Sequence, residues 1–242
     1  MSFITKVKEF FNKYVFNEKW RCNVCDKEIF EEGYFCKDCL EKLPFNNGKI
    51  CLHCGRKVIA TEEYCTTCKN VLVSIDLGRS AFDYKDEVRN LIHSYKYDNK
   101  KYLAKVFAST LAPIFFKNFL DANVITYVSM TSDAEKARGY NQSKELAEEV
   151  SKLVNVKVIN TNEKKDDVKE QKKLNRQERL ANITNAFKII NKKEIKGKNV
   201  VIIDDVTTTG ATAEAIASKL KKVGALKVYL LTIASVSPIG GY

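Results

Sequence analysis

Eight cysteines in four C-x-x-C pairs constrain this chain more than any other feature of its sequence. All of them lie between Cys22 and Cys68, and the 174 residues that follow contain none. The last four repeat the first four at a distance of 29 positions, so the pattern C-x2-C-x10-C-x2-C occurs twice. Each C-x-x-C pair directs two sulfur atoms at one cation, and two pairs complete a tetrahedral zinc site.

We therefore expect about two zinc ions, held by Cys22, Cys25, Cys36, Cys39, Cys51, Cys54, Cys65 and Cys68. Their role is structural, because four thiolates leave no coordination position for a substrate and the segment is too small to build its own core. Consecutive pairs can share an ion, or alternate pairs can do so in a cross-braced arrangement, and the spacing allows both.

The sequence predicts a cytoplasmic protein without membrane insertion. The first 16 residues lack the uninterrupted apolar core of a signal peptide, and no apolar stretch has the ~20 residues of a membrane helix. In that reducing compartment, structural disulfides are disfavoured as an alternative to zinc.

After the cysteine segment, strand-like and helix-like apolar patterns alternate along the chain. Strands are expected at residues 75–84, 124–130, 156–159, 186–190, 200–203 and 227–233, and helices at 88–95, 103–115, 146–154 and 213–220. This alternation predicts an α/β domain with a parallel sheet at residues 75–242. Residues 1–74 are expected to hold a short amphipathic N-terminal helix at residues 1–18 and the small zinc-binding segment with its tandem four-cysteine sites. Residues 160–182 are polar and dense in charge, as in many lids and binding segments.

The stretch from Val200 to Thr212 is the part of the sequence that most clearly indicates a ligand-binding site. Four apolar residues form a buried strand, and Asp204 and Asp205 stand at its carboxyl end, where open α/β sheets bind ligands. A loop rich in Thr and Gly then leads into a helix, whose first N–H groups favour a phosphate. The two carboxylates are placed to accept hydrogen bonds from sugar hydroxyls or to hold Mg²⁺.

This stretch resembles the phosphoribosyl pyrophosphate (PRPP) motif of type I phosphoribosyltransferases. The resemblance implies that Asp204 and Asp205 bind the ribose hydroxyls. It assigns the 5′-phosphate to Thr207, Thr208, Thr209, Gly210, Ala211 and Thr212, with Mg²⁺ accompanying PRPP.

Further segments extend the likeness. They are the helix from Tyr84 through Lys96 and Tyr97, the run Arg138-Gly139-Tyr140-Asn141-Gln142, and the spaced residues from Gln171 to Phe187. With the cysteine pairs, the whole pattern is similar to the ComF family (ComFC-like proteins), bacterial proteins of DNA uptake in natural transformation. The resemblance implies a zinc-ribbon head on a type I phosphoribosyltransferase-like domain that binds PRPP and single-stranded DNA. A competence-associated DNA helicase is an implied partner.

One segment departs from the family pattern. Where the family usually has a Pro and several basic residues, this chain has Ser129, and Asp133 and Glu135 precede Lys136 and Arg138. By resemblance this region faces pyrophosphate, with Lys136 and Arg138 as the remaining cationic contacts. Two acids weaken the positive field that pyrophosphate needs, so the sequence leaves turnover open and assigns no catalytic residue.

The formal charge of +11 favours a polyanion as partner, and two segments are candidates for single-stranded DNA. Residues 160–200 carry twelve Lys and Arg against six Asp and Glu, and residues 82–105 interleave aromatic and basic side chains. Single strands are bound by such a mixture of cations and stacking rings. The predicted contacts are Lys96, Lys100, Lys101, Lys172, Lys173, Arg176 and Arg179.

Three functions follow from these expectations. The chain handles single-stranded DNA with a PRPP-binding fold, or it is a catalytic phosphoribosyltransferase acting with Mg²⁺ on an unidentified base or amine, or it senses PRPP without turnover.

Overall fold

The computed structural model describes residues 21–30, 33–59, 61–69, 73–165 and 185–237, and it divides into two compact units, residues 1–43 and 44–242. The second group of four cysteines lies in the same unit as the sheet. The predicted N-terminal helix lies outside the described residues. Within the described ranges, no helix has both the length and the apolar character needed to cross a membrane.

The first unit contains the first group of cysteines and the short helix α2 (Lys37–Lys42). A β-bridge joins Arg21 to Glu28 around the first C-x-x-C pair, and another joins Ile50 to Lys57 around the third pair in the second unit. These bridges are 29 positions apart, so the repeat seen in the sequence is also a repeat of backbone structure.

A four-stranded parallel sheet forms the centre of the second unit. Its strands lie in the order β1 (Leu77–Asp83), β6 (Lys227–Ser235), β5 (Asn199–Thr207) and β2 (Val124–Tyr127). All three pairings are parallel, which confirms the predicted class of sheet. All residues of β6 after Lys227 are buried, and β5 has only buried and partly buried residues, as expected for a sheet covered on both faces.

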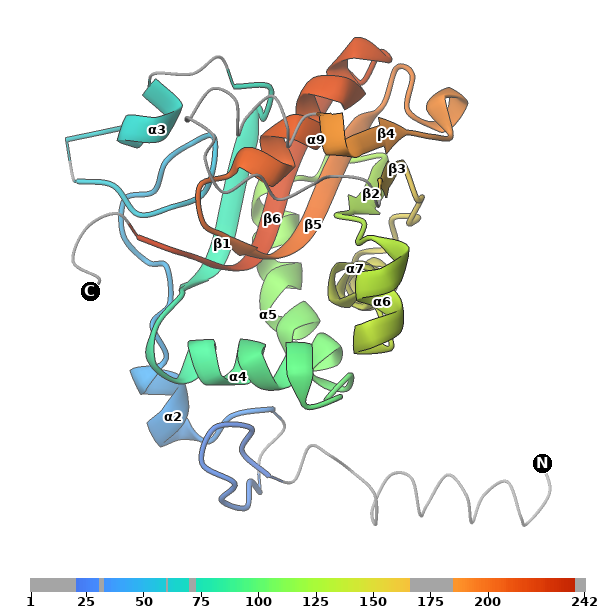
Figure 1. Cartoon of the computed structure of the whole chain (residues 1–242). Coiled ribbons are helices and arrows are strands. Elements are labelled where there is room, and N and C mark those ends of the chain that lie inside the picture. The colour runs from blue at the N-terminus through green and yellow to red at the C-terminus, as the bar shows by residue number, and fades with distance from the viewer. Residues whose placement is uncertain (1–20, 31–32, 60, 70–72, 166–184, 238–242) are drawn as a thin grey trace, which may run out of the picture. The chain divides into compact units, whose positions relative to one another are not determined.

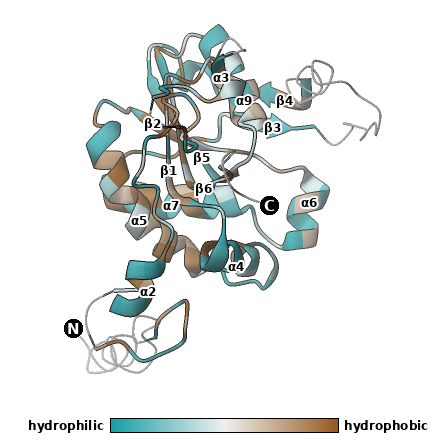
Figure 2. Ribbon diagram, turned by 90° about the vertical axis from the view of Figure 1, so that its left-hand side faces the viewer, coloured by the Kyte–Doolittle hydropathy of each residue, from teal (hydrophilic) through white to brown (hydrophobic). Residues whose placement is uncertain are grey.

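Helices cover both faces of this sheet (Figure 1). On one face, α5 (Leu103–Asn118) and α7 (Gln142–Val154) contact the strands. On the other, α9 (Ala211–Lys222) packs its Ile216 and Leu220 against Val200 and Val228. Figure 2 shows the resulting concentration of hydrophobic residues in the strands and in the helices behind them.

Two further helices lie at the carboxyl end of the strands. Helix α4 (Asp86–Tyr97) follows β1, and α6 (Ser132–Arg138) follows β2. Tyr95 of α4 was predicted to be a core residue, and it is fully buried, with its hydroxyl donating to the Gln142 carbonyl oxygen at 2.6 Å. This bond ties α4 to the first residue of α7.

The strand expected at residues 186–190 forms, but outside the main sheet. As β4 (Phe187–Ile189) it pairs antiparallel with β3 (Asn162–Lys164), and the 3₁₀-helix η2 (Lys192–Glu194) follows. Residues 156–159 contribute only a bridge between Val158 and Ile125. Most of the charged segment 160–182 lies outside the described residues. The second cysteine segment ends with the short helix α3 (Thr66–Lys69), and residues 70–72 after it also lie outside the described residues.

The second cysteine segment packs against β1 so closely that Gly78 has no room for a side chain. A Cβ at Gly78 would lie 2.3 Å from the His53 carbonyl oxygen, and the Gly78 N–H donates to the Leu52 carbonyl at 2.7 Å. The close backbone approach explains why the two parts form one unit.

We predict that Gly78→Ala destabilises the protein by about 1–3 kcal/mol, because the added methyl group must push two backbones apart. Urea unfolding measures the change. Gly48→Ala is the matched control, since nothing lies within 4 Å of a Cβ at that position. Equal midpoints for the two variants would contradict the packing described here.

Candidate functional site

The candidate site lies where β5 extends past its neighbour β2. Strand β2 ends at Tyr127, opposite Ile203, whereas β5 continues to Thr207 alongside β6. The strand predicted at residues 200–203 is therefore longer than expected and includes both aspartates. Asp204 and Asp205 lie on the part of β5 that β2 leaves uncovered.

Asp205 is buried and is held by two side chains from different helices. Lys96 of α4 places its Nζ 2.8 Å from Oδ1, and Gln142 of α7 donates through Nε2 to Oδ2 at 2.7 Å. Only 7% of the Asp205 side chain is exposed, so its charge needs these partners.

Asp204 accepts a hydrogen bond from the Ser143 hydroxyl at 2.9 Å. Ser143 lies in the first turn of α7, whose positive end favours a nearby anion. Burial, followed by the adjacent charge of Asp205, nevertheless raises the pKa of Asp204 to about 7. The two aspartates together therefore favour a ligand that brings a positive charge or donates hydrogen bonds, because either would stabilise Asp204 in its charged form beside Asp205.

The Thr-Gly loop, defined as residues 207–212, connects β5 to α9. Gly210 is the N-cap of α9 and has φ = +79°, a conformation that L side chains rarely adopt. Thr208 and Thr209 are exposed, and the Thr209 hydroxyl accepts from the Ala211 N–H at 3.3 Å. The loop thus presents hydroxyls and the first N–H groups of a twelve-residue helix at the end of the strand that carries the carboxylates.

Arg138, predicted on the pyrophosphate side, is linked to this pair through Gln142. Its Nη1 donates to Gln142 Oε1 at 2.5 Å, and Gln142 in turn donates to Asp205. Lys136 lies exposed on α6.

The departure at Ser129 has a structural consequence. The Ser129 N–H donates to Asn162 Oδ1 at 3.1 Å, and its hydroxyl donates to the Asn162 carbonyl oxygen. A proline has no N–H and could not make the first of these bonds. The substitution therefore ties the end of β2 to β3.

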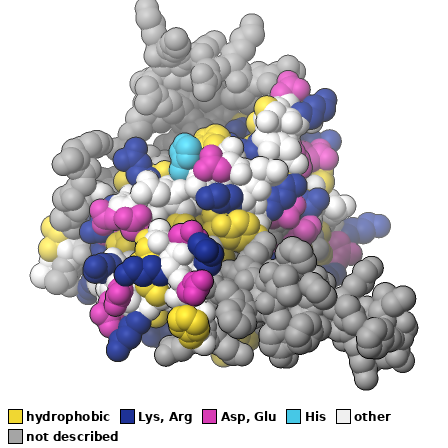
Figure 3. Space-filling view, turned by 90° about the horizontal axis from the view of Figure 1, so that it is seen from below, with side chains coloured by type: hydrophobic (Ala, Val, Ile, Leu, Met, Phe, Trp, Pro, Cys, Tyr) yellow, Lys and Arg dark blue, Asp and Glu magenta, His cyan; other side chains and the backbone are white. Residues whose placement is uncertain are grey.

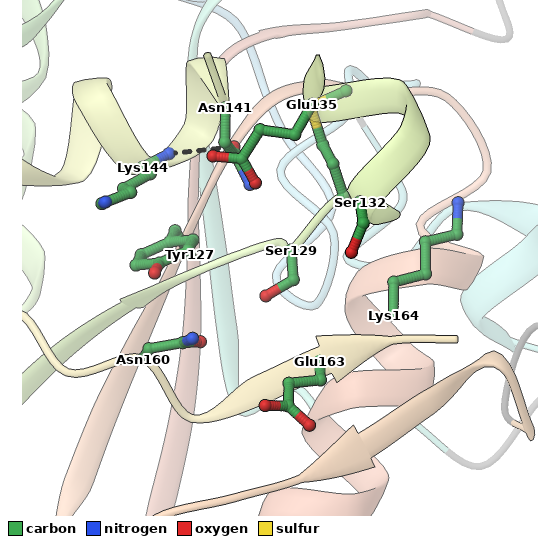
Figure 4. A pocket seen from close by; sticks show the side chains of 10 residues that line it. Tyr127, Ser129, Ser132, Glu135, Asn141, Lys144, Asn160, Glu163 and Lys164 are labelled. Atoms are coloured by element: carbon green, nitrogen blue, oxygen red, sulfur yellow. Dashed lines mark hydrogen bonds between the residues drawn. The ribbon is translucent and has the colours of Figure 1, made fainter. Parts of the chain in front are cut away.

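A polar pocket of about 440 Å³ opens beside this junction (Figure 4). Its polar lining includes Tyr127, Ser129, Asn141 and Asn160. Two cationic side chains, Lys144 and Lys164, and two anionic ones, Glu135 and Glu163, also line it. None of its lining residues belongs to the aspartate pair or to the Thr-Gly loop.

The cysteines form two clusters of consecutive pairs, which answers the question of pairing. The first cluster is Cys22, Cys25, Cys36 and Cys39, and the second cluster is Cys51, Cys54, Cys65 and Cys68; within each, the sulfur atoms all lie within 4.8 Å of one another. Two Sγ–Sγ distances, Cys25–Cys36 and Cys54–Cys65, are 3.7 Å. A tetrahedron with zinc–sulfur bonds of ~2.3 Å has an edge of ~3.8 Å, so both clusters fit zinc.

The residues predicted to contact DNA are placed differently from one another. Lys96 faces Asp205, as described above. Lys100 is exposed, and the Lys101 ammonium lies 4.8 Å from the centre of the Tyr140 ring. Lys172, Lys173, Arg176 and Arg179 lie outside the described residues.

A groove along α4, here called the α4 groove, adds aromatic surface to this region. It is lined by Tyr84, Arg89, Asn90, His93 and Tyr97. The Tyr97 ring is exposed. It is tilted by 47° to the His93 ring, with ring centres 4.9 Å apart, and its centre lies 5.1 Å from the Arg138 guanidinium. Figure 3, seen from below Figure 1, shows Lys and Arg side chains interspersed with Asp and Glu on this side of the molecule.

Sequence reasoning did not assign Gln142 and Ser143 to the site, and it gave Lys96 to DNA. Gln142 could have been identified from the sequence, because it ends the run that begins at Arg138 and resembles the pattern of the ComF family. The fold brings these residues to Asp204 and Asp205 from 61 to 109 positions away.

Comparison with known families agrees with this architecture. A model of the double zinc ribbon domain matches residues 13–69, and a model of the phosphoribosyl transferase domain matches residues 136–237. The fold and the two matches define a parallel-sheet phosphoribosyltransferase-like protein with an N-terminal double zinc ribbon.

Relatives of similar length narrow the class. The chain is 25% identical to Competence protein F of Haemophilus influenzae, covering 89% of this chain and 96% of that protein. It is 28% identical to Competence protein ComFC of Bacillus subtilis, covering 79% and 84%. It is also 25% identical to DNA utilization protein YhgH of Escherichia coli, covering 86% of each. The resemblance to the ComF family is confirmed.

We predict that Asp204→Asn makes the protein more stable at pH 8. With a folded-state pKa of about 7 against an ordinary value of 3.8, the folded protein binds more protons than the unfolded chain between these values. The free energy of unfolding therefore falls as the pH rises from about 4 to about 7, because the folded protein must give up the proton of Asp204. An Asn at this position has no proton to lose, so the variant does not lose stability in this way. Thermal melts from pH 5 to 8 should show the variant melting higher by at least ~2 °C at pH 8.

Asp121→Asn is the control with the opposite sign. The hydrogen bond from Lys227 holds the pKa of Asp121 below its usual range, so this carboxylate stabilises at neutral pH and loses its effect only in acid. A wild-type melting temperature that does not change between pH 5 and 8, or an Asp204→Asn variant less stable than wild type at pH 8, would contradict the prediction.

Proposed function

We propose that the chain binds PRPP or a related ribose 5-phosphate at the carboxyl end of β5, and that it uses this domain in handling single-stranded DNA during DNA uptake. The observation that carries the proposal is the placement of Asp204 and Asp205 immediately before the Thr-Gly loop, at the open end of a phosphoribosyl transferase domain. The names of the relatives, competence proteins and a DNA utilization protein, supply the biological context.

The geometry supports separate contacts for the phosphate and the ribose of the ligand. A 5′-phosphate would take the N–H groups and hydroxyls of the Thr-Gly loop, at the positive end of α9. The ribose hydroxyls would donate to Asp204 and Asp205, which are acceptors already arranged by Ser143 and Gln142. Mg²⁺ would enter with the ligand, since one or two carboxylates plus phosphate oxygens are the set it prefers.

We predict that calorimetry with PRPP and Mg²⁺ detects binding to the wild type, and that Asp205→Asn weakens it by about tenfold or more. The variant removes a charged acceptor, and hydrogen bonds to charged groups contribute ~1.5–3 kcal/mol. Asp38→Asn, an exposed acid in the first turn of α2, is the control and should bind as wild type does. No binding to wild type, or full affinity in Asp205→Asn, would refute the ligand assignment.

For DNA, the α4 groove and the neighbouring Lys100 offer both elements that single strands need. Tyr97 presents an exposed ring for a base to stack on, and Arg89 and Lys100 supply cationic groups for phosphates. Lys96 is assigned instead to the ribose-phosphate ligand, because its ammonium lies against Asp205.

We predict that Tyr97→Ala weakens binding of a short oligothymidine strand by about fivefold or more, since base stacking on a ring contributes ~1–3 kcal/mol. Tyr97→Phe keeps the ring and should bind as the wild type does. Lys100→Ala should lower the slope of log affinity against log salt by about one. Fluorescence anisotropy at several salt concentrations gives both quantities. Equal losses in the Ala and Phe variants would exclude stacking at Tyr97.

The alternative functions share the same ligand site. A catalytic phosphoribosyltransferase would release pyrophosphate when given PRPP, Mg²⁺ and a base or amine, and a PRPP sensor would bind without release. The acids Asp133 and Glu135 near Arg138 disfavour a strong pyrophosphate site, so we propose binding rather than turnover. The helicase partner implied by the family resemblance belongs to the same proposal.

A further inference from the structure

The second cluster lies directly against the Thr-Gly loop. A Cβ at Gly210 would lie 3.6 Å from the Cβ of Cys54, which is ordinary van der Waals contact. The cysteines of this cluster are buried, with exposed fractions between 0% and 9%. A metal bound here would therefore lie beside the candidate ligand site, although no cysteine belongs to that site.

Arg56 bridges the cluster and the loop with three donor groups. Its Nε lies 3.3 Å from Cys54 Sγ, its Nη2 lies 3.0 Å from Cys65 Sγ, and its Nη1 donates to the Thr208 carbonyl oxygen at 2.9 Å. The residue is only 6% exposed. Because the guanidinium is planar and rigid, the positions of the two sulfur atoms determine where the third donor points.

The backbone around Arg56 is fixed from the other side as well. Gly55 has φ = +74°, and a Cβ there would lie 2.9 Å from the backbone of Arg79 in β1. The Gly55 carbonyl accepts from Asn46 Nδ2 at 3.0 Å. The knuckle that presents Arg56 is thus held against the sheet, and the side chain transmits that position to the loop.

The positive charge of Arg56 also matters, because Arg56 lies between the second cluster and the Thr-Gly loop. A zinc ion with four thiolates has a net charge of −2, which would repel a phosphate arriving at the adjacent loop. Arg56 places a cation between this charge and Thr208. Loss of the metal would release the constraint that holds the sulfur atoms together, which would leave a buried guanidinium without its sulfur acceptors.

The repeat provides an internal comparison. The residue 29 positions before Arg56 is Lys27, which follows the equivalent knuckle of the first cluster and is exposed. A Lys at this position has no planar fork with which to hold two sulfur atoms and a carbonyl at once. The bridge is therefore a feature of the second cluster among the described residues.

We propose that Arg56 is a positioning residue for the Thr-Gly loop, through which metal in the second cluster and a ribose-phosphate ligand promote each other's binding. This inference rests on the proposed function for its ligand and adds a role for the zinc ribbon in that site. By linkage, a metal that favours the ligand-binding form of the loop must be held more tightly when the ligand is bound.

The test compares wild type, Arg56→Lys and Lys27→Ala in the full-length protein. Zinc release to a chromogenic chelator is followed with and without PRPP and Mg²⁺, and PRPP affinity is measured by calorimetry. The release phase of the first cluster is identified with Cys25→Ser. In wild type, PRPP should slow release from the second cluster by about threefold or more and leave the first unchanged.

Arg56→Lys should retain both zinc ions, lose the protection by PRPP and bind PRPP about tenfold more weakly, whereas Lys27→Ala should match wild type. If Arg56→Lys fails to fold, the protection measured in wild type still decides the question. Zinc release that PRPP does not alter in a wild type that binds PRPP would overturn the inference, as would full PRPP affinity in a zinc-loaded Arg56→Lys variant.

A wild type that binds no PRPP would instead refute the proposed function. The positioning role is then tested without ligand, by amide hydrogen exchange of residues 208–211 in the zinc-loaded proteins. Arg56→Lys should exchange these amides faster than wild type and Lys27→Ala. Equal exchange in all three would overturn the role of Arg56.

Discussion

Repulsion between two adjacent carboxylates is the constraint around which the ligand end of this fold is arranged. Asp204 and Asp205 lie on the part of β5 that β2 leaves uncovered, and burial raises the cost of charging both. Three helices contribute to the compensation. Helix α4 supplies Lys96, the start of α7 supplies Gln142 and Ser143, and Arg138 at the end of α6 supports Gln142. The pair costs stability, so its presence is best explained by a ligand that compensates its charge.

The double zinc ribbon is a repeat in sequence whose two copies have different surroundings. Both clusters share the knuckle geometry, the bridge and the consecutive pairing of cysteines. The second copy, however, belongs to the compact unit of the sheet, where Gly78 and Gly55 permit backbone contact with the knuckle. The second of the two similar metal modules thus lies in contact with the Thr-Gly loop, at Gly210 and Thr208.

Local sequence patterns were sufficient to predict that the eight cysteines form two groups of four, that the sheet is parallel, and that a loop rich in Thr and Gly joins a buried strand to a helix. Each depends on spacing along a short stretch, such as C-x-x-C or four apolar residues followed by two aspartates. The missed features depend on contacts between distant residues. The assignment of Lys96 to DNA followed from its basic neighbours, but the fold turns its ammonium toward Asp205, 109 positions away. Likewise, no pattern near Arg56 indicates that its guanidinium reaches Thr208, 152 positions away.

The central claim is that the end of β5 binds a ribose phosphate through the Thr-Gly loop. Amide hydrogen exchange of the zinc-loaded protein, measured with and without PRPP and Mg²⁺, tests it most directly. The account predicts slower exchange at residues 208–211 and in the first turn of α9 when the ligand is present. Unchanged exchange there at saturating PRPP, or protection confined to the α4 groove, would contradict it.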